Sequence, residues 1–320
     1  MNKDERKSPP AGDKGVKIIA PATVANLVCG FDVLGMALND PQDIMELSLS
    51  DEPGIRIRHV DEYDLPTAPS QNVAGAGLLA LLQEYDKKIG FDLIINKCIK
   101  PGSGLGSSAA SSAGAVVAAN YLLDGFFSKE DLVRFAMNGE KLASGVKHAD
   151  NIAPCIYGGV TLIRSIFPLD IIQLSAPPMY VTVVHPQIEV KTSDARQILR
   201  KEVLLKDAIK QWGNIAGLVA GFMKNDYELI SRSLEDVIIE PVRSILIPGF
   251  EEVKKRSKEA GALGGGISGS GPSIFMLSRE ETTARQIEKV MTGIFEKVGI
   301  DFKTYVTTLN HEGVKIVSNL

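Results

Sequence analysis

The chain has 320 residues, with 35 Lys and Arg against 39 Asp and Glu, and 44% of its residues are hydrophobic. This length indicates about two domains, and the hydrophobic fraction is too high for a disordered chain. The net charge of −4 argues against a nucleic-acid binder. No apolar stretch approaches the length of a membrane span, so we expect none. The 30 glycines are the most informative count, because they are clustered.

The first residues and the cysteines narrow the class further. Residues 1–15 are charged and lack an apolar core, so we expect a short flexible tail rather than a secretory signal. Cys29, Cys98 and Cys155 are few, odd in number and widely spaced, which argues against a disulfide framework or a structural zinc site. These features favour a cytoplasmic enzyme with isolated reduced thiols.

The first half of the folded chain, residues 16–167, is predicted to mix strands and helices. Val16–Ala20 is a short apolar run that ends at Pro21 and fits a first strand. A loop rich in glycine and serine, residues 101–108, runs into a helix that reaches Leu123 and whose alanine and valine content predicts burial. The other predicted strands are 44–49, 55–60, 91–99 and 160–166, and the other predicted helices are 73–85 and 129–142.

The second half, residues 168–320, is predicted to form another domain. It contains a second glycine-rich loop, residues 264–272. Because the strands do not alternate regularly with helices, the sequence predicts an α+β fold rather than a doubly wound sheet. The predicted strands are 179–185, 273–277 and 303–309, and the predicted helices are 192–199, 204–223, 226–234, 250–260 and 280–298.

Both glycine loops are similar to a dinucleotide-binding fingerprint, and we expect neither to be one. Gly104–Ala109 has the GxGxxA spacing, and Gly264–Gly269 has the GxGxxG spacing. The fingerprint needs a following helix and then a strand that carries an acid. The late loop leads into a strand, and the helix after the early loop is followed by another helix. A Walker A loop is absent too, because neither glycine run is followed by Gly-Lys-Ser/Thr.

The loop at 101–108 predicts a phosphate site instead. Its glycines let phosphate oxygens approach the backbone, and the start of the following helix attracts anions through its free N–H groups and its dipole. Ser107 and Ser108 add hydroxyls that can bind phosphate or a metal. Three glycines and two serines at a helix start favour this interpretation over a tight structural turn. The late loop, taken alone, fits a turn and a phosphate lid equally well.

Three blocks of sequence resemble the superfamily of galactokinase, homoserine kinase, mevalonate kinase and phosphomevalonate kinase, and they occur in its order. The blocks are Ala20–Gly35, Ile99–Ala110 and Gly264–Pro272. The combination of Asn26, Gly30-Phe31-Asp32 and His148–Asn151 is similar to the homoserine kinase family in particular. The resemblance implies two α+β domains, the first like ribosomal protein S5 domain 2 and the second like a ferredoxin-like sandwich. It also implies phosphorylation of L-homoserine by ATP to O-phospho-L-homoserine, on the route to threonine.

A site for homoserine needs an acid for the ammonium, arginine for the carboxylate and a polar group for the hydroxyl. Asp32 is a natural partner of the ammonium. By resemblance, Arg196 and Arg243 grip the carboxylate, a task that suits the guanidinium fork better than lysine, and Asn26 can hydrogen-bond the hydroxyl. The substrate-binding residues implied by the resemblance are Asn26, Asp32, His148, Thr192, Arg196 and Arg243.

Phosphoryl transfer needs charge neutralisation and in-line alignment more than a strong base. By resemblance, Ser108 and Glu140 hold Mg²⁺, with Ser107 as the near alternative. Asn151 is expected to stabilise the transition state. Asp150 as a base is left open, because the γ-phosphate can take the proton instead. The ATP-binding residues implied are Pro101, Gly102, Ser103, Gly104, Leu105, Gly106, Ser107, Ser108, Gly266, Ser268 and Gly269.

Two other functions stay open at this point. One is a related kinase for mevalonate, shikimate or a diphosphocytidyl alcohol, whose substrates lack an ammonium and leave Asp32 poorly explained. The other is an inactive nucleotide-binding sensor, against which the presence of Ser107, Ser108 and Glu140 argues. The expected partners are ATP, Mg²⁺ and L-homoserine, with no nucleic acid and no membrane. The oligomeric state cannot be read from the sequence, and a homodimer stays open.

Overall fold

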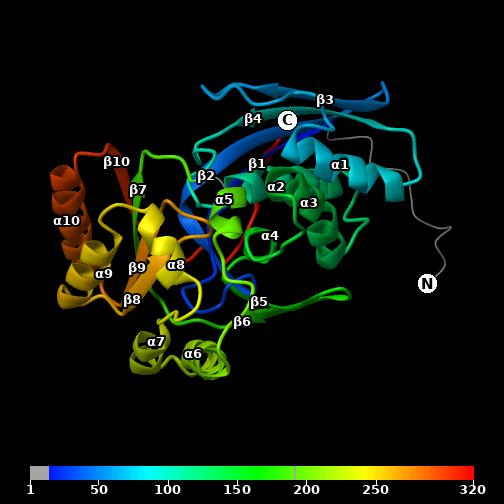
Figure 1. The fold of residues 1–320 in the computed structure, drawn as a ribbon. Helices are drawn as coiled ribbons and strands as arrows, with labels where there is room; N and C mark the ends of the chain where they lie inside the picture. The colour runs from blue at the N-terminus through cyan, green and yellow to red at the C-terminus, as the bar shows by residue number, and fades with distance from the viewer. Residues whose placement is uncertain (1–13, 191) are drawn as a thin grey trace.

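The computed structural model describes residues 14–190 and 192–320, which form two sheets with helices packed against each (Figure 1). The strands of the larger sheet are β1 (Gly15–Ala25), β2 (Leu34–Ser50), β3 (Gly54–His59), β4 (Gly90–Asn96), β5 (Val160–Ile166), β6 (Leu169–Leu174) and β11 (Lys315–Asn319). They pair in the order β11-β1-β2-β4-β3, and β2 also pairs with β5, which pairs with β6. β3 pairs with β4 in parallel, and the other pairs are antiparallel.

The hairpin of β1 and β2 is the feature of this sheet that matters most for the site. Its pairing runs from Gly15 opposite Ser48 to Ala25 opposite Gly35, so residues 26–33 form the turn at its end. β2 is long enough to pair with β4 over its second half and with β5 at its start. This pairing fixes where the turn lies relative to the rest of the sheet.

Four helices lie on one side of the larger sheet (Figure 1). They are α1 (Val73–Glu84), α2 (Ser107–Leu122), α3 (Lys129–Ser144) and α4 (Ile152–Tyr157). Asn72 caps α1 by accepting hydrogen bonds from the N–H groups of residues 74 and 75, and Ser128 with Asp131 forms a capping box at the start of α3. These caps satisfy N–H groups that have no partner inside a helix.

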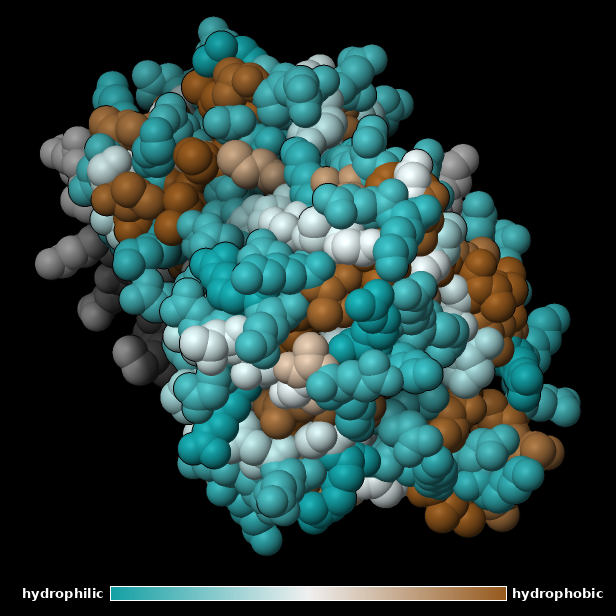
Figure 2. Space-filling model, turned by 90° about the vertical axis from the view of Figure 1, so that its left-hand side faces the viewer, coloured by the Kyte–Doolittle hydropathy of each residue, from teal (hydrophilic) through white to brown (hydrophobic). Residues whose placement is uncertain are grey.

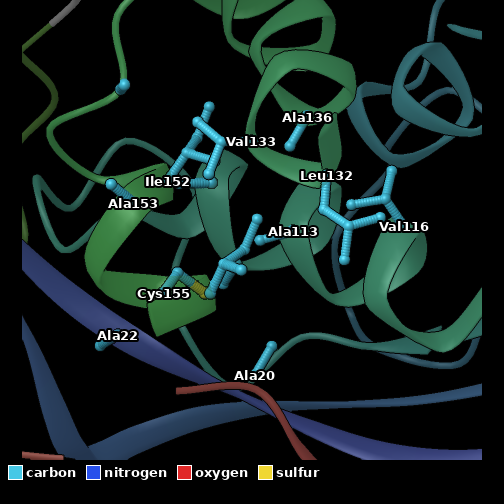
Figure 3. Close-up of a cluster of buried hydrophobic side chains, with 14 of the residues drawn as sticks. Ala20, Ala22, Ala113, Val116, Leu132, Val133, Ala136, Ile152, Ala153 and Cys155 are labelled. Carbon is cyan, nitrogen blue, oxygen red and sulfur yellow. The ribbon is translucent and has the colours of Figure 1, made fainter. Parts of the chain in front are cut away.

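Small side chains let α2 lie close to its neighbours in the core. Of its 16 residues, 12 are buried, and most of these are alanine, serine or glycine. Figure 3 shows Ala113 and Val116 of α2 among Leu132, Val133 and Ala136 of α3, Ile152, Ala153 and Cys155 of α4, and Ala20 and Ala22 of β1. Such close packing holds the start of α2 in a defined place.

The smaller sheet has the strands β7 (Tyr180–Pro186), β8 (Gly264–Ile267), β9 (Ile274–Ser278) and β10 (Phe302–Thr308). They pair antiparallel in the order β10-β7-β9-β8. Two helices, α9 (Phe250–Glu259) and α10 (Glu281–Val298), pack on this sheet. The resulting βαββαβ order confirms the ferredoxin-like prediction for the second domain. Between β7 and α9 come α5 (Thr192–Gln197), α6 (Leu205–Lys224), α7 (Tyr227–Ser233), α8 (Glu240–Arg243) and the short 3₁₀ helix Ser244–Leu246.

Most predicted elements recur in the structure with small shifts of their ends. The predicted end of the first strand at Pro21 is wrong, because β1 continues to Ala25 through its pairing with β2. Part of the predicted late loop is β8, because Gly264–Ile267 pairs with β9. The first part of β2, together with β6, α4, α8 and β11, had no predicted counterpart. The division between residues 167 and 168 stays a prediction; β6 and β11 lie on the larger sheet although both follow it. Residues 1–13 of the predicted tail lie outside the described residues.

The surface is hydrophilic over most of the face in Figure 2, with hydrophobic side chains in separate patches. Among the described residues, we find no helix with the length and apolar character needed to cross a membrane. The three cysteines are free thiols. Burial raises the pKa of Cys29 to about 12 and holds that of Cys155 well above its ordinary value.

Candidate active site

A cavity of about 440 Å³ brings both halves of the chain together. It is lined by the β1–β2 turn, the loop before α2, the end of α3, and residues from α5, α8 and the loop after β8. The predicted site residues that line it are Asn26, Asp32, Pro101, Gly102, Gly104, Gly106, Ser107, Ser108, Glu140, His148, Asp150, Asn151, Arg196, Arg243 and Gly269. Ser103, Leu105, Gly266 and Ser268 lie behind this lining, and the side chain of Thr192 is outside the described ones.

The loop before α2 has a backbone that only glycine adopts readily. Gly102, Gly104 and Gly106 have φ angles of 74°, 79° and 66°. A Cβ at Gly104 would lie 2.6 Å from the carbonyl oxygens of both Ser268 and Gly271. No side chain caps the start of α2, whose N-cap is Gly106. The free N–H groups of this helix therefore face the cavity as an anion site.

The two glycine-rich loops hold each other. Ser268 Oγ donates to the carbonyl of Gly104 at 2.6 Å, and Ser273 N donates to that of Ser103 at 3.2 Å. Asn26 Nδ2 donates to the carbonyl of Gly269 at 2.9 Å. Ser268 thus joins the loops from behind. The second loop forms one wall of the cavity through Gly269 and Ser270.

The two serines at the start of α2 have different surroundings. Ser107 Oγ donates its hydrogen to the carbonyl of Ile99 at 2.8 Å, in a buried hydrogen bond within the fold. Ser108 Oγ donates to Glu140 Oε2 at 2.9 Å, at the wall of the cavity. A hydroxyl beside a carboxylate is an oxygen pair that suits Mg²⁺. In residues 14–190 and 192–320, no group of three or more His, Cys, Asp or Glu side chains could hold a metal, so the remaining ligands would be phosphate oxygens and water.

Lys97 lines the same part of the cavity and was missed by the sequence analysis. Its buried ammonium contacts the carboxylate of Asp43, and donates to the carbonyl of Ser107 and to Ser111 Oγ, each at 2.8 Å. Asp43 also accepts from the N–H groups of residues 98 and 99. The pair ties β2 to the segment that leads into the phosphate loop. The sequence signal that could have pointed to Lys97 is its place between an apolar strand and a glycine loop.

The β1–β2 turn holds an unusual run of left-handed residues. Asn26, Leu27, Val28 and Asp32 have φ angles of 75°, 42°, 67° and 60°. Residues other than glycine rarely adopt this region, and such strain gathers at functional sites. Asn26 Oδ1 accepts from Asp32 N at 3.1 Å. With its contact to Gly269, the Asn26 side chain therefore fixes the turn against the second glycine loop.

Asp32 and Arg196 contact each other directly. Arg196 Nη2 donates to Asp32 Oδ1 at 2.8 Å and to Oδ2 at 3.0 Å. Arg196 Nε is buried without a hydrogen-bond partner. The two residues predicted to take the ammonium and the carboxylate of the substrate thus neutralise each other, and one donor is left unused.

Arg243 completes this end of the cavity. Its Nε donates to the carbonyl of Ala195 at 2.9 Å, and its Nη1 to that of Gly269 at 3.2 Å. The guanidinium centres of Arg243 and Arg196 lie 4.9 and 5.4 Å from the centre of the Phe31 ring. Burial and the neighbouring Arg196 charge lower the pKa of Arg243 to about 10, so it stays protonated at neutral pH.

The third group of predicted residues lies between the two ends of the cavity. Burial raises the pKa of Asp150 to about 8, and the charges of Asp32 and Glu140 add to this effect. Asn151 Oδ1 accepts from Thr23 Oγ1 at 2.7 Å, which leaves its amide hydrogens for another partner. His148 lines the cavity with its Nε2 3.2 Å from Ser144 Oγ.

Known proteins match this chain over nearly its whole length. Residues 72–159 match the family of the GHMP kinases N terminal domain, and residues 218–297 match the GHMP kinases C terminal family. The chain is similar to the homoserine kinase of Chloroherpeton thalassium, at 45% identity over 318 residues, covering 95% of this chain and 100% of that protein. It is also similar to the homoserine kinase of Methanocella arvoryzae, at 41% identity over 303 residues, covering 95% and 97%.

Solved structures of homoserine kinase and of a more distant kinase also match this chain. The structure of homoserine kinase from Cytophaga hutchinsonii superposes with a TM-score of 0.92 at 46% identity, covering 98% of this chain and 100% of that one. The mevalonate kinase of L. major, at 15% identity and a TM-score of 0.68 with 96% and 98% covered, shares the fold alone. The chain therefore belongs to the GHMP kinases and, within them, to the homoserine kinase family. The family prediction and the two-domain α+β prediction are confirmed.

Proposed function

We propose that the protein transfers the γ-phosphoryl group of ATP to the side-chain hydroxyl of L-homoserine, giving O-phospho-L-homoserine and ADP on the route to threonine. The observation that carries this proposal is that one cavity holds both a free helix start with its glycine loop and, facing it, Asp32 with two arginines. The first suits a phosphate chain, and the second suits the ammonium and the carboxylate of an amino acid. Relatives named homoserine kinase, at 41–45% identity, support the same substrate.

Homoserine binding exchanges the contact between Asp32 and Arg196 for two contacts with the substrate. Its ammonium replaces the guanidinium beside Asp32, and its carboxylate bridges Arg196 and Arg243. The unpartnered Arg196 Nε supports this arrangement, because a buried donor without a partner gains a hydrogen bond when the carboxylate arrives. The charges exchange one for one, so the cavity stays electrically balanced.

ATP lies along the other end of the cavity. Its phosphates accept hydrogen bonds from the backbone N–H groups of residues 102–108, with Gly269 on the opposite side. Ser103 and Ser268 act from behind through the hydrogen bonds that join the two loops. Leu105 supports the first loop through its bonds with Ser103 and Thr23, and Gly266 supports the second as part of β8. Leu65, Val73 and Ala143 line an apolar part of the cavity that suits the adenine ring.

Ser108 and Glu140 would hold Mg²⁺ when ATP is bound. The metal would supply charge neutralisation for the phosphates. The Ser108–Glu140 contact supports this role, since both oxygens already lie together at the start of α2. Ser107 is the weaker candidate, because its hydroxyl is used by the Ile99 carbonyl.

The substrate hydroxyl attacks the γ-phosphorus, and the bond to the β-phosphate oxygen breaks. Asn151 donates its free amide hydrogens to the transferring group, and Asn26, His148 and Thr192 help to place the hydroxyl. Asp150 carries a proton at neutral pH in the ligand-free protein, so it is a poor acceptor for the hydroxyl proton. We therefore assign that proton to an oxygen of the transferred phosphoryl group.

The test is turnover of the purified protein with Mg²⁺, ATP and a panel of small alcohols, followed as release of ADP. We expect L-homoserine to be turned over well above mevalonate and shikimate. Turnover of another alcohol in its place would contradict the substrate assignment. An absence of turnover with any alcohol would favour a nucleotide-binding sensor.

A further inference from the structure

Arg196 and Arg243 bring two positive charges to the same end of the cavity. Asp32 offers both of its oxygens to Arg196, and Asp150 carries a proton at neutral pH because burial raises its pKa to about 8. The charge of Arg196 reaches Arg243, since it adds to burial in lowering the pKa of Arg243 to about 10. The two guanidinium groups therefore repel each other in the ligand-free protein.

One aromatic ring contacts both of these guanidinium groups. The hydrogen bonds of Arg243 go to neutral carbonyl oxygens, those of Ala195 and Gly269. The centres of the Arg243 and Arg196 guanidinium groups lie 4.9 and 5.4 Å from the centre of the Phe31 ring. A cation within about 6 Å of a ring centre is attracted to the negative face of the π system. Phe31 is half-buried and lines the cavity, so it draws the two cations to one place.

The β1–β2 turn fixes this ring beside Asp32. Gly30 N donates to the carbonyl of Asn26 at 2.8 Å, and the Gly30 carbonyl accepts from the N–H groups of residues 33 and 34 at 3.0 and 2.9 Å. A Cβ at Gly30 would lie 2.5 Å from the side chain of Leu34, so the turn is tightly closed. Asp32 N donates to Asn26 Oδ1 at 3.1 Å. The backbone is thus held on both sides of Phe31, and two consecutive residues present a π face and a carboxylate to the arginines.

We propose that Phe31 is a positioning residue that holds Arg196 and Arg243 together before the substrate arrives, so that the substrate carboxylate meets a preformed pair of guanidinium groups. This inference rests on the proposed function, which places the carboxylate of homoserine between the two arginines. Without the ring, the arginines separate, and binding the carboxylate has to bring them back together at a cost in affinity. Once bound, the carboxylate offsets the repulsion itself. Phe31 therefore acts on carboxylate binding and not on the phosphoryl transfer step.

Steady-state kinetics of two substitutions at Phe31 tests the proposal. Phe31→Leu removes the aromatic face and keeps an apolar side chain, whereas Phe31→Tyr keeps the face. In Phe31→Leu, we expect KM for homoserine to rise about 10-fold, with kcat and KM for ATP within about 2-fold of the wild-type values. Phe31→Tyr should stay within about 3-fold of the wild type for all three. Phe126→Leu, at another half-buried phenylalanine that does not line the cavity, is the control and should change none of them.

Two ligands that keep or lose the carboxylate distinguish positioning from a general loss of structure. L-2-aminobutanoate keeps the ammonium and the carboxylate but lacks the hydroxyl, so its binding, measured by calorimetry, tests the site without turnover. Phe31→Leu should raise its Kd about 10-fold, and should leave kcat/KM for 3-aminopropan-1-ol, which has no carboxylate, within about 2-fold of the wild type.

An unchanged Kd for L-2-aminobutanoate in Phe31→Leu would overturn the proposal. So would an equal loss with 3-aminopropan-1-ol, because the ring would then support the cavity in general and not the carboxylate site. A wild-type protein that binds L-2-aminobutanoate as expected but does not phosphorylate homoserine would contradict the proposed function and leave the role of Phe31 supported.

Discussion

Arg196 and Asp32 lie 164 residues apart in the chain and hold each other across the candidate active site, with Arg196 Nη2 2.8 Å from Asp32 Oδ1. Their side chains are 29% and 35% exposed. An ion pair this exposed contributes only about 0–1 kcal/mol to stability, so opening it costs little. A zwitterionic substrate replaces each partner by a group of the same charge. The contact thus keeps both charges in position until the substrate arrives.

Replacing Arg243 should weaken homoserine binding much more than ATP binding. Arg243→Ala removes one side of the carboxylate site, and Arg243→Lys keeps the charge but loses the planar fork. We expect KM for homoserine to rise ~10- to 100-fold in both variants, with a smaller change in KM for ATP. Steady-state kinetics against each substrate measures this. Arg279→Ala, at an exposed arginine of the second half, is the matched control. An unchanged KM for homoserine in Arg243→Ala would refute the role.

Ser108 and Ser107 are neighbours with different predicted roles. Ser108→Ala removes the hydroxyl beside Glu140, so we expect kcat to fall by about 10²-fold or more and the Mg²⁺ concentration for half-maximal rate to rise. Ser107→Ala removes a bond to the Ile99 carbonyl and should lower the free energy of unfolding by about 1 kcal/mol without changing the Mg²⁺ dependence. A Mg²⁺ titration of both variants compares them. The assignment fails if Ser107, and not Ser108, changes the metal dependence.

Gly102 and Gly104 of the phosphate loop have similar φ angles but different room for an added Cβ. A Cβ at Gly104 would collide with two carbonyl oxygens of the second glycine loop, whereas a Cβ at Gly102 meets no atom within 4 Å. We expect Gly104→Ala to separate the loops and to raise KM for ATP at least ~10-fold, while Gly102→Ala costs only about 1 kcal/mol of backbone strain. Nucleotide binding measured by calorimetry distinguishes them. Equal effects of the two substitutions would show that the contact between the loops is not needed for ATP binding.

Asp150→Asn should change the pH dependence of stability. Burial raises the pKa of Asp150 to about 8, from 3.8 in the unfolded chain. Between these values the folded protein keeps a proton that the unfolded chain has released. The stabilisation is therefore complete below the unfolded pKa and is lost as pH rises through the folded pKa. Because the amide in the Asp150→Asn variant has no proton to lose, the free energy of unfolding of the variant relative to the wild type should grow on the order of a few kcal/mol between about pH 5 and 8.

Urea unfolding at several pH values measures that difference, with Asp92→Asn as a control at an exposed carboxylate. A difference that does not depend on pH would show that Asp150 is ionised in the folded protein. The same variant tests the fate of the hydroxyl proton. Near-normal kcat for Asp150→Asn would agree with its transfer to the phosphoryl group, and a loss of about 10²-fold or more would favour Asp150 as the base.

Local patterns carried much of the sequence prediction. The loop before α2 was predictable because glycine, serine and a following apolar helix are neighbours in the chain. Helices α1 and α10 were also predictable, because the spacing of their apolar residues is visible in the local sequence. In contrast, β6 and β11 exist because of their partners β5 and β1, which local sequence does not reveal. The loop from 264 begins as a strand for the same reason.

Most of the residues that line the candidate site could be named from the sequence, but their contacts could not. Resemblance named Asp32 and Arg196, yet only the fold shows that they touch. Lys97 looked like an ordinary lysine at the end of a strand, because its partner Asp43 lies on another strand. Phe31 stood next to a candidate residue, and its position beneath two guanidinium groups depends on α5 and α8.

The most direct test compares L-homoserine with two analogues that each lack one charged group. In 4-hydroxybutanoate the ammonium is missing, and in 3-aminopropan-1-ol the carboxylate is missing, while both keep the primary hydroxyl. If Asp32 and the two arginines read the two charges, kcat/KM for each analogue should fall at least about 100-fold below that for homoserine, and Asp32→Asn should narrow the gap between homoserine and 4-hydroxybutanoate. Comparable kcat/KM for 4-hydroxybutanoate and homoserine in the wild-type protein would contradict the account.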